Sequence, residues 1–287
     1  MNKGVVMSLL ASLLLSMMNV FVKELSTIMG TGEIAFFRGF FGVIFLLFLM
    51  WKQGRKFSNK DRLMLVTRGV FGGIGMYCYF VALAGMALAD VSIIAQLSAF
   101  FVLFFAAVFL KEKLPKGAVL PIILIVAGMC TIIRPWEYAS FSWYALAALG
   151  GAFFSAAAYT TIRNITLAGG HDEMEIVFYF LASATVVGAV VMSQETFVVP
   201  DMYGWTLIGG MSLVSLLAQI CLTEAYGKTN PVLASFVQYS GVFFNCLWGF
   251  ILFEEVLSLM TVIGGICIIG GSIYLTRLKN TAALQKG

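Results

Sequence analysis

Long apolar runs recur along almost the whole chain, and they limit its possible folds more than any other feature of the sequence. A run of about 20 residues is long enough for a helix to cross a hydrocarbon core of about 30 Å. A bilayer offers no hydrogen-bonding partner to the backbone, so an isolated apolar run of this length must be helical. We predict ten membrane-spanning helices, at residues 4–23, 32–51, 65–85, 89–110, 117–134, 142–162, 173–192, 204–224, 231–253 and 257–276. The composition supports this prediction, because 61% of the residues are hydrophobic and only 11% are charged.

The second half of the chain repeats the first in altered form. A shift of about 142 positions lays residues 231–256 over residues 89–114, and it pairs Gln96 with Gln238. Each half contains five predicted spans, an odd number, so the second half must enter the membrane from the opposite side. We therefore predict an all-α integral membrane protein of two inverted five-helix repeats. Secondary transporters often have this design, in which one repeat rocks against the other around a central site.

The domain boundaries follow from the repeat and from the predicted spans. We expect a first repeat, an external connector, a second repeat and a cytoplasmic tail, at residues 1–135, 136–141, 142–278 and 279–287.

The distribution of charge predicts the orientation in the membrane. If the N-terminus is cytoplasmic, most lysines and arginines fall in inner segments, as the positive-inside rule requires, and only Lys23 and Arg134 fall outside. We therefore predict a multi-pass protein of the cell (inner) membrane with both termini cytoplasmic. This orientation explains the net charge of +4 without a nucleic-acid partner. The expected partners are the lipid bilayer and a small-molecule substrate, and a homodimer is compatible with the sequence.

The sequence lacks the residue patterns of the main catalytic and metal-binding classes. The five cysteines all lie in predicted helices without paired spacing, and the single histidine, His171, has no partner histidine, so we expect no metal and no cofactor. A nucleotide-binding loop of the type G-x-x-x-x-G-K-[ST] is missing, which argues against ATP-driven transport. We expect a transporter and no enzyme. A receptor or a structural membrane protein is the alternative class.

Polar residues inside the spans predict the wall of a central cavity. Ser8, Ser12, Ser16 and Asn19 share one stripe of the first span, which could pack against a neighbouring helix or line a cavity. Gln96 and Gln238 must each face protein or water, either as cavity lining or as interhelical contacts, because an unpaired amide in hydrocarbon costs several kcal/mol. In the ninth span, positions 238, 241, 245 and 248 form one face. The candidate wall residues are Asn19, Tyr77, Gln96, Tyr159, Gln238, Tyr239 and Asn245.

Arg38 is a further candidate for substrate binding. It lies about six residues, on the order of 9 Å, inside the second span, where a guanidinium is costly unless it is paired or faces water. It could form an ion pair with Glu33, extend to the outer headgroups, or bind a carboxylate or phosphate of the substrate. These alternatives stay open at the level of sequence.

Several motifs together resemble those of one transporter family. They are Phe36-Phe37-Arg38, Arg68-Gly69, Lys111-Glu112-Lys113, Glu224-Ala225-Tyr226 and Phe253-Glu254-Glu255. The chain is similar in these motifs to the drug/metabolite transporter (DMT) superfamily, in particular to its EamA-like members with two five-helix repeats. Many members have a proline early in the fourth span, where this chain has Ser98-Ala99, so the bend that such a proline produces is not assured.

The resemblance implies a function and an order of preference among substrates. It implies alternating-access transport, secondary active or facilitative, of a small polar organic metabolite, with export of an amino acid or related metabolite as the first expectation. Uptake of a nucleoside-like metabolite such as S-adenosylmethionine is the second. Arginines are common in the family at the positions of Arg38 and Arg68, which favours a structural role for both.

Overall fold

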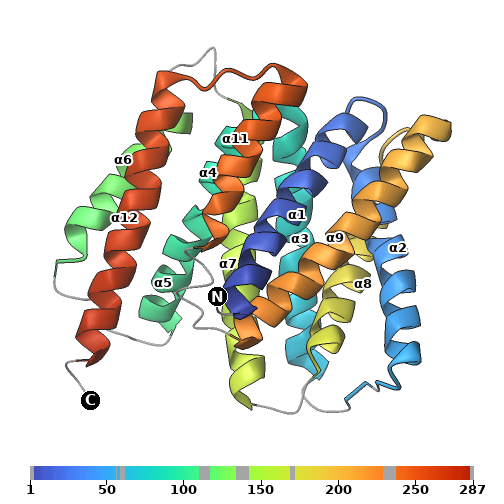
Figure 1. Ribbon diagram of the computed structural model, residues 1–287, viewed down its shortest axis with the longest axis horizontal. Helices are drawn as coiled ribbons and strands as arrows, with labels where there is room; N and C mark the ends of the chain where they lie inside the picture. The colour runs from blue at the N-terminus through green and yellow to red at the C-terminus, as the bar shows by residue number, and fades with distance from the viewer. Residues whose placement is uncertain are drawn as a thin grey trace.

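The computed structural model describes residues 3–55, 57–58, 62–109, 117–133, 142–168, 172–228 and 237–284. These residues are almost entirely helical (Figure 1). The helices of the first half are α1 (Lys3–Leu25), α2 (Thr31–Lys52), α3 (Arg62–Gly85), α4 (Leu88–Ala95), α5 (Leu97–Phe109) and α6 (Val119–Ile133). Those of the second half are α7 (Trp143–Ala168), α8 (Glu173–Met192), α9 (Met202–Lys228), α11 (Ser240–Phe253) and α12 (Leu259–Leu284).

The contacts between helices confirm the inverted repeat. The repeat relates α1 to α7, α3 to α9, and the α4–α5 pair to α11. In the structure α1 packs against α9 and α11, and the equivalent helix α7 packs against α3 and α5. The remaining equivalent helices pack against each other, α2 against α8 and α6 against α12. The α6–α12 pair lies at one side of the bundle, and α2 and α8 lie at the other (Figure 1).

The predicted fourth span, residues 89–110, is interrupted, which corrects the expectation of one continuous helix. The helix ends at Ala95 and restarts at Leu97, and the Gln96 N–H donates to the Ile93 carbonyl three residues earlier, as in a tight 3₁₀ turn. No proline is needed for this break. In the ninth predicted span α11 begins only at Ser240, after a turn at Tyr239. The two glutamines that first indicated the repeat therefore lie next to matching helix breaks.

Glycines allow the repeats to approach closely. A Cβ on Gly75 would lie 3.0 Å from the Ser155 backbone nitrogen of α7, and one on Gly73 would lie 3.0 Å from the Ala184 nitrogen of α8. Between α6 and α12, a Cβ on Gly271 would lie 3.0 Å from the Pro121 carbonyl oxygen. Small residues at such positions let helices associate in membranes, where lipid removes the hydrophobic driving force.

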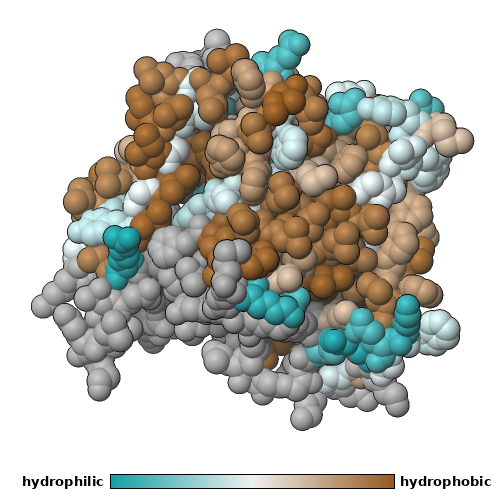
Figure 2. All heavy atoms as spheres, viewed as in Figure 1, coloured by the Kyte–Doolittle hydropathy of each residue, from teal (hydrophilic) through white to brown (hydrophobic). Residues whose placement is uncertain are grey.

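The outer surface of the bundle is suited to lipid. Within the described residues, five helices are long and apolar enough to cross a membrane, and further shorter helices are strongly apolar. Large side chains on one face of α2 are exposed, among them Phe40, Ile44, Phe48 and Trp51. Figure 2 shows apolar residues over most of the described part of the visible face. Such a surface requires a bilayer, since a soluble protein rarely exposes an apolar area of this extent.

Candidate functional site

Two polar stripes, one from each repeat, face each other across the contact between α1 and α11. The Ser12 hydroxyl lies 3.5 Å from the Gln238 amide oxygen, and the Trp248 indole N–H donates to the Ser16 hydroxyl at 3.1 Å. The sequence predicted both stripes as walls of one central cavity, and in the structure they contact each other directly. We call this contact the polar α1/α11 face, and its members are Ser12, Ser16, Asn19, Gln238, Asn245 and Trp248.

An amide pair occupies the part of this face nearest the C-terminal end of α1, next to a tyrosine hydroxyl. The Asn19 amide nitrogen donates to the Asn245 amide oxygen at 3.0 Å and to the Tyr79 hydroxyl at 2.9 Å. The Asn245 amide nitrogen donates to the Gly241 carbonyl at 2.7 Å. A carbonyl can only accept, so this last bond turns the Asn245 oxygen toward Asn19, and Asn19 must present its NH₂ group. The network thus fixes the orientation of both amides.

Two buried polar atoms of the face have no partner within the described residues. They are the amide oxygen of Asn19 and the amide nitrogen of Gln238. The Asn19 side chain is almost fully buried, so an unsatisfied acceptor there costs about 1–3 kcal/mol. Ser12, which contacts Gln238, lies two helical turns before Asn19, or about 10 Å along α1. The face therefore offers an unpaired acceptor at one end and an unpaired donor at the other.

The other predicted wall residues are not members of this face. Gln96 is half-buried at the break between α4 and α5, and Tyr239 lies at the turn before α11, near Ser272 of α12. Tyr159 is 43% exposed, and its hydroxyl lies close enough to Arg68 and Tyr79 for electrostatic interaction.

For the two tyrosines of α3, the structure differs from the sequence-based choice. Both are half-buried and pack against the apolar core, and the Tyr79 hydroxyl also accepts a hydrogen bond from the Asn19 amide. Tyr77 is the wall residue predicted from the sequence, whereas it is Tyr79 that accepts the hydrogen bond from Asn19.

Arg38 belongs to a different environment from the polar α1/α11 face. Its side chain is 2% exposed, its Nε donates to the Ser215 hydroxyl at 2.6 Å, and it also contacts the Met76 sulfur. The guanidinium lies 5.4 Å from the ring of Phe80 and 5.6 Å from that of Phe180. The expected alternatives of an ion pair with Glu33 and of an extended side chain at the headgroups are therefore wrong.

Glu33 is fully buried and accepts a hydrogen bond from the Val198 N–H at 2.8 Å. The Arg38 guanidinium is therefore stabilised inside the bundle without Glu33, through cation–π contacts with the rings of Phe80 and Phe180.

A network of charged groups joins the repeats at the end of α1, the end predicted to face outward. The Lys23 ammonium forms an ion pair with Glu255, which follows α11, and donates to the Met86 carbonyl at 2.8 Å. The second carboxylate oxygen of Glu255 accepts the Leu88 N–H at 2.8 Å.

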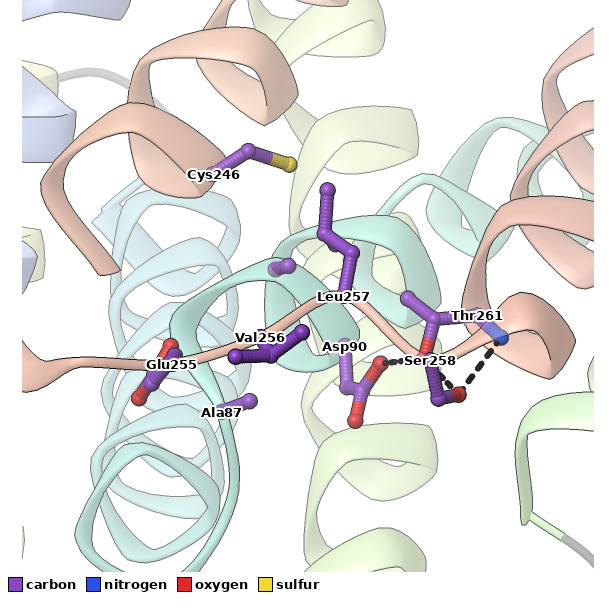
Figure 3. Close-up of a pocket in the computed structure, with 9 residues that line it drawn as sticks. Ala87, Asp90, Cys246, Glu255, Val256, Leu257, Ser258 and Thr261 are labelled. Atoms are coloured by element: carbon purple, nitrogen blue, oxygen red, sulfur yellow. Dashed lines mark hydrogen bonds between the residues drawn. The ribbon is translucent and has the colours of Figure 1, made fainter. Parts of the chain in front are cut away.

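A pocket of about 190 Å³ lies beside this network, between α4, α11 and the start of α12. Figure 3 shows Glu255 and Asp90 on its wall, with Asp90 accepting from Thr261 at 2.7 Å. Cys246 also lines it. The pocket lies beside the polar α1/α11 face. The side chains of that face contact one another directly, so the pocket does not extend between them. In this structure the face is closed.

Comparisons with known proteins agree with the fold and the repeat. The profile of the EamA-like transporter family matches residues 2–134 and 142–277. The pseudopaline exporter CntI of Pseudomonas aeruginosa is 39% identical over 280 residues, which cover 97% of this chain and 98% of the exporter.

More distant relatives and one solved structure extend these comparisons. The riboflavin transporter of Brucella anthropi is 25% identical over 250 residues, covering 85% of this chain and 87% of the transporter. Human solute carrier family 35 member G1 is 25% identical over 94% of this chain and 78% of its own. A crystal structure matches 97% of this chain and 98% of its own with a TM-score of 0.67, at 17% identity.

Proposed function

The chain belongs to the EamA-like transporter family, and from this premise we propose that it exports a small polar metabolite by alternating access. Pseudopaline, or a compound chemically related to it, is the first candidate. The observation that carries this proposal is the 39% identity to a pseudopaline exporter over nearly the full length of both chains. Alternating access is supported by the inverted repeats, whose equivalent helices make equivalent contacts.

The polar α1/α11 face is the binding site in this proposal. It joins the two repeats, so relative motion of the repeats opens it. Its two unpaired atoms suit a metabolite with an N–H donor for the Asn19 oxygen and a carbonyl or carboxylate acceptor for the Gln238 nitrogen. Along α1, Ser12, which contacts Gln238, lies about 10 Å from Asn19, which is longer than the spacing between the amino and carboxyl groups of a single amino acid. An elongated metabolite with polar groups at both ends therefore fits better than a free amino acid.

Because the two stripes contact each other directly, substrate binding must separate α1 from α11. The substrate then replaces the contacts of Ser12 with Gln238 and of Ser16 with Trp248. Arg38 does not take part, since its guanidinium is enclosed by Phe80 and Phe180. Its role in the proposal is to tie α2 to α9 through Ser215.

Export can be tested in Pseudomonas aeruginosa cells that lack their own pseudopaline exporter. Expression of the parent chain is expected to restore extracellular pseudopaline, measured by mass spectrometry of the medium. Asn19→Ala, which lacks one amide of the proposed site, is compared with the parent. The abundance of both proteins in the membrane is measured by immunoblot. If the parent chain is present in the membrane and pseudopaline stays inside the cells, the substrate assignment is wrong. Accumulation of labelled S-adenosylmethionine by cells that express the parent would instead support the uptake alternative.

A further inference from the structure

Lys23 is an exception to the charge distribution, because it lies at the end of α1 predicted to face outward, where few basic residues occur. The positive-inside rule therefore does not explain why a lysine occurs at this position. In the structure its side chain is only 18% exposed, and its ammonium is paired with Glu255, whose side chain is 16% exposed. The other described ion pairs are more open to solvent, with side-chain exposures of 67% and 26% for Lys3–Glu224 and 39% and 27% for Arg55–Asp172. The Lys23 pair is thus shielded in a way that the others are not.

The backbone holds Glu255 in place for this pairing. Glu254 ends α11 in the left-handed conformation, with φ 53°, which is uncommon for a residue other than glycine. The following N–H, that of Glu255, donates to the Gly249 carbonyl, six residues earlier, at 3.0 Å, so this left-handed cap turns the chain back over the last turn of α11. Gly249 also leaves room for the carboxylate, because a Cβ there would collide with Glu255. The cap therefore directs the chain so that Glu255 points back toward α1 and α4.

We infer that Lys23 and Glu255 form the latch of an outer gate, closed in this structure. The pair connects α1 and the α3–α4 turn of the first repeat to the end of α11 in the second, through Lys23, Met86, Leu88 and Glu255. The polar α1/α11 face begins one helical turn below Lys23, at Asn19. A substrate held there can reach the outer side only after this pair separates. The inference rests on alternating access, but it does not depend on the identity of the substrate.

The latch contributes to the balance between closed and outward-open states. An ion pair that is largely shielded from water and holds further hydrogen bonds is stronger than a surface pair. We expect its loss to raise the outward-open population about tenfold, which corresponds to about 1.4 kcal/mol. Loss of the exposed Lys3–Glu224 pair should leave that population unchanged.

The test measures access to Ser16, which is fully buried and lies about two helical turns below Lys23 on α1. Ser16→Cys is introduced, and intact cells are treated with a membrane-impermeant methanethiosulfonate reagent. Mass spectrometry of the labelled peptides separates this site from the native cysteines. Labelling is expressed as the modified fraction of the peptide that contains position 16, because Cys246 shares a pocket with Glu255 and is not an independent reference. No substrate is added, so failure of the pseudopaline assignment does not affect the result.

Two latch variants and three controls decide the outcome. Lys23→Met keeps the length of the side chain and removes its charge, and it is expected to raise the labelled fraction at position 16 about tenfold relative to the parent. Glu255→Gln is expected to do the same and serves if Lys23→Met does not fold. Lys23→Arg, which keeps the charge, and Lys3→Met are expected to stay at the parent level. Glu254→Gln is also expected to stay there, because the Glu254 side chain is exposed.

Two results would overturn the latch. One is unchanged labelling in a folded latch variant. The other is an equal rise in Lys3→Met or Glu254→Gln, which would show general loosening of the bundle in place of a gate.

Discussion

The contact of α1 with α11 and the contact of α5 with α7 are related by the repeat, yet their chemistry is opposite. The first is lined by hydroxyls and amides, among them the Asn19–Asn245 pair. The second is aromatic, since the ring of Phe153 on α7 packs edge-to-face against Phe101 at 5.5 Å and Phe105 at 5.0 Å. The same architecture therefore supports a polar and an apolar version of one interface. Architecture alone does not require the polar side chains, so we assign them to the substrate and the aromatic contact to stability.

The largest effect is expected from Asn245→Ala, which removes the acceptor of one Asn19 N–H bond. The N–H left unpaired in a buried position should lower the free energy of unfolding by about 1–3 kcal/mol. Export should fall by more than the loss of folded protein explains, because the amide pair also sets the position of the substrate. Export per folded molecule, with folding measured by SDS titration, checks both parts. If export per folded molecule stays at the parent level, the polar face does not bind the substrate.

The converse change is Phe153→Ala in the aromatic interface. The change removes the two edge-to-face contacts of Phe153 with Phe101 and Phe105 on α5, each worth about 0.5–1.5 kcal/mol beyond burial. It should therefore lower the free energy of unfolding by about 2 kcal/mol. The side chain is partly exposed, so the chain is expected to fold. Export per folded molecule should remain at the parent level. A selective loss of export would remove the distinction between the two interfaces.

A smaller effect is expected from Tyr79→Phe, which removes a hydroxyl and keeps the ring. Asn19 retains its bond to Asn245, so the expected loss of stability is about 1 kcal/mol. Tyr77→Phe is the matched control on the same helix, because both tyrosines pack against the apolar core and Asn19 donates to Tyr79 and not to Tyr77. Thermal melting of both variants checks this difference. A larger loss for Tyr77→Phe would contradict the placement of the two tyrosines.

Trp248→Phe should have the smallest effect. It removes the bond to Ser16 and keeps an aromatic ring, and interhelical hydrogen bonds in membranes average about 0.6 kcal/mol. SDS titration of Trp248→Phe, Ser16→Ala and the double variant gives the coupling energy. Additive losses would show that the bond contributes nothing to stability.

Much of the fold could be predicted from the sequence because hydrophobic length and repetition are strong signals. Each predicted span overlaps a helix of the described residues, and the family assignment is confirmed by the match over both halves. The break at Gln96 was not predicted, since no proline or glycine marks it. The domain boundaries and the membrane orientation stay predictions.

The site could be predicted only in part. The two stripes are visible as spacings of three and four residues, but their pairing depends on how α1 packs against α11. The choice of Tyr79 over Tyr77 depends on the rotation of α3 about its axis, which an evenly apolar helix does not reveal. The Lys23–Glu255 pair joins residues more than 200 positions apart, although the outward location of Lys23 was a usable signal.

Ligand-induced thermal stabilisation tests the assignment of the binding site most directly. A ligand that binds the folded state raises the melting temperature by mass action, so purified parent, Asn245→Ala and Phe153→Leu are melted with and without pseudopaline. The account predicts a concentration-dependent rise for the parent and for Phe153→Leu, and none for folded Asn245→Ala. An equal rise in all three proteins would place the substrate elsewhere and reduce the polar α1/α11 face to a packing contact.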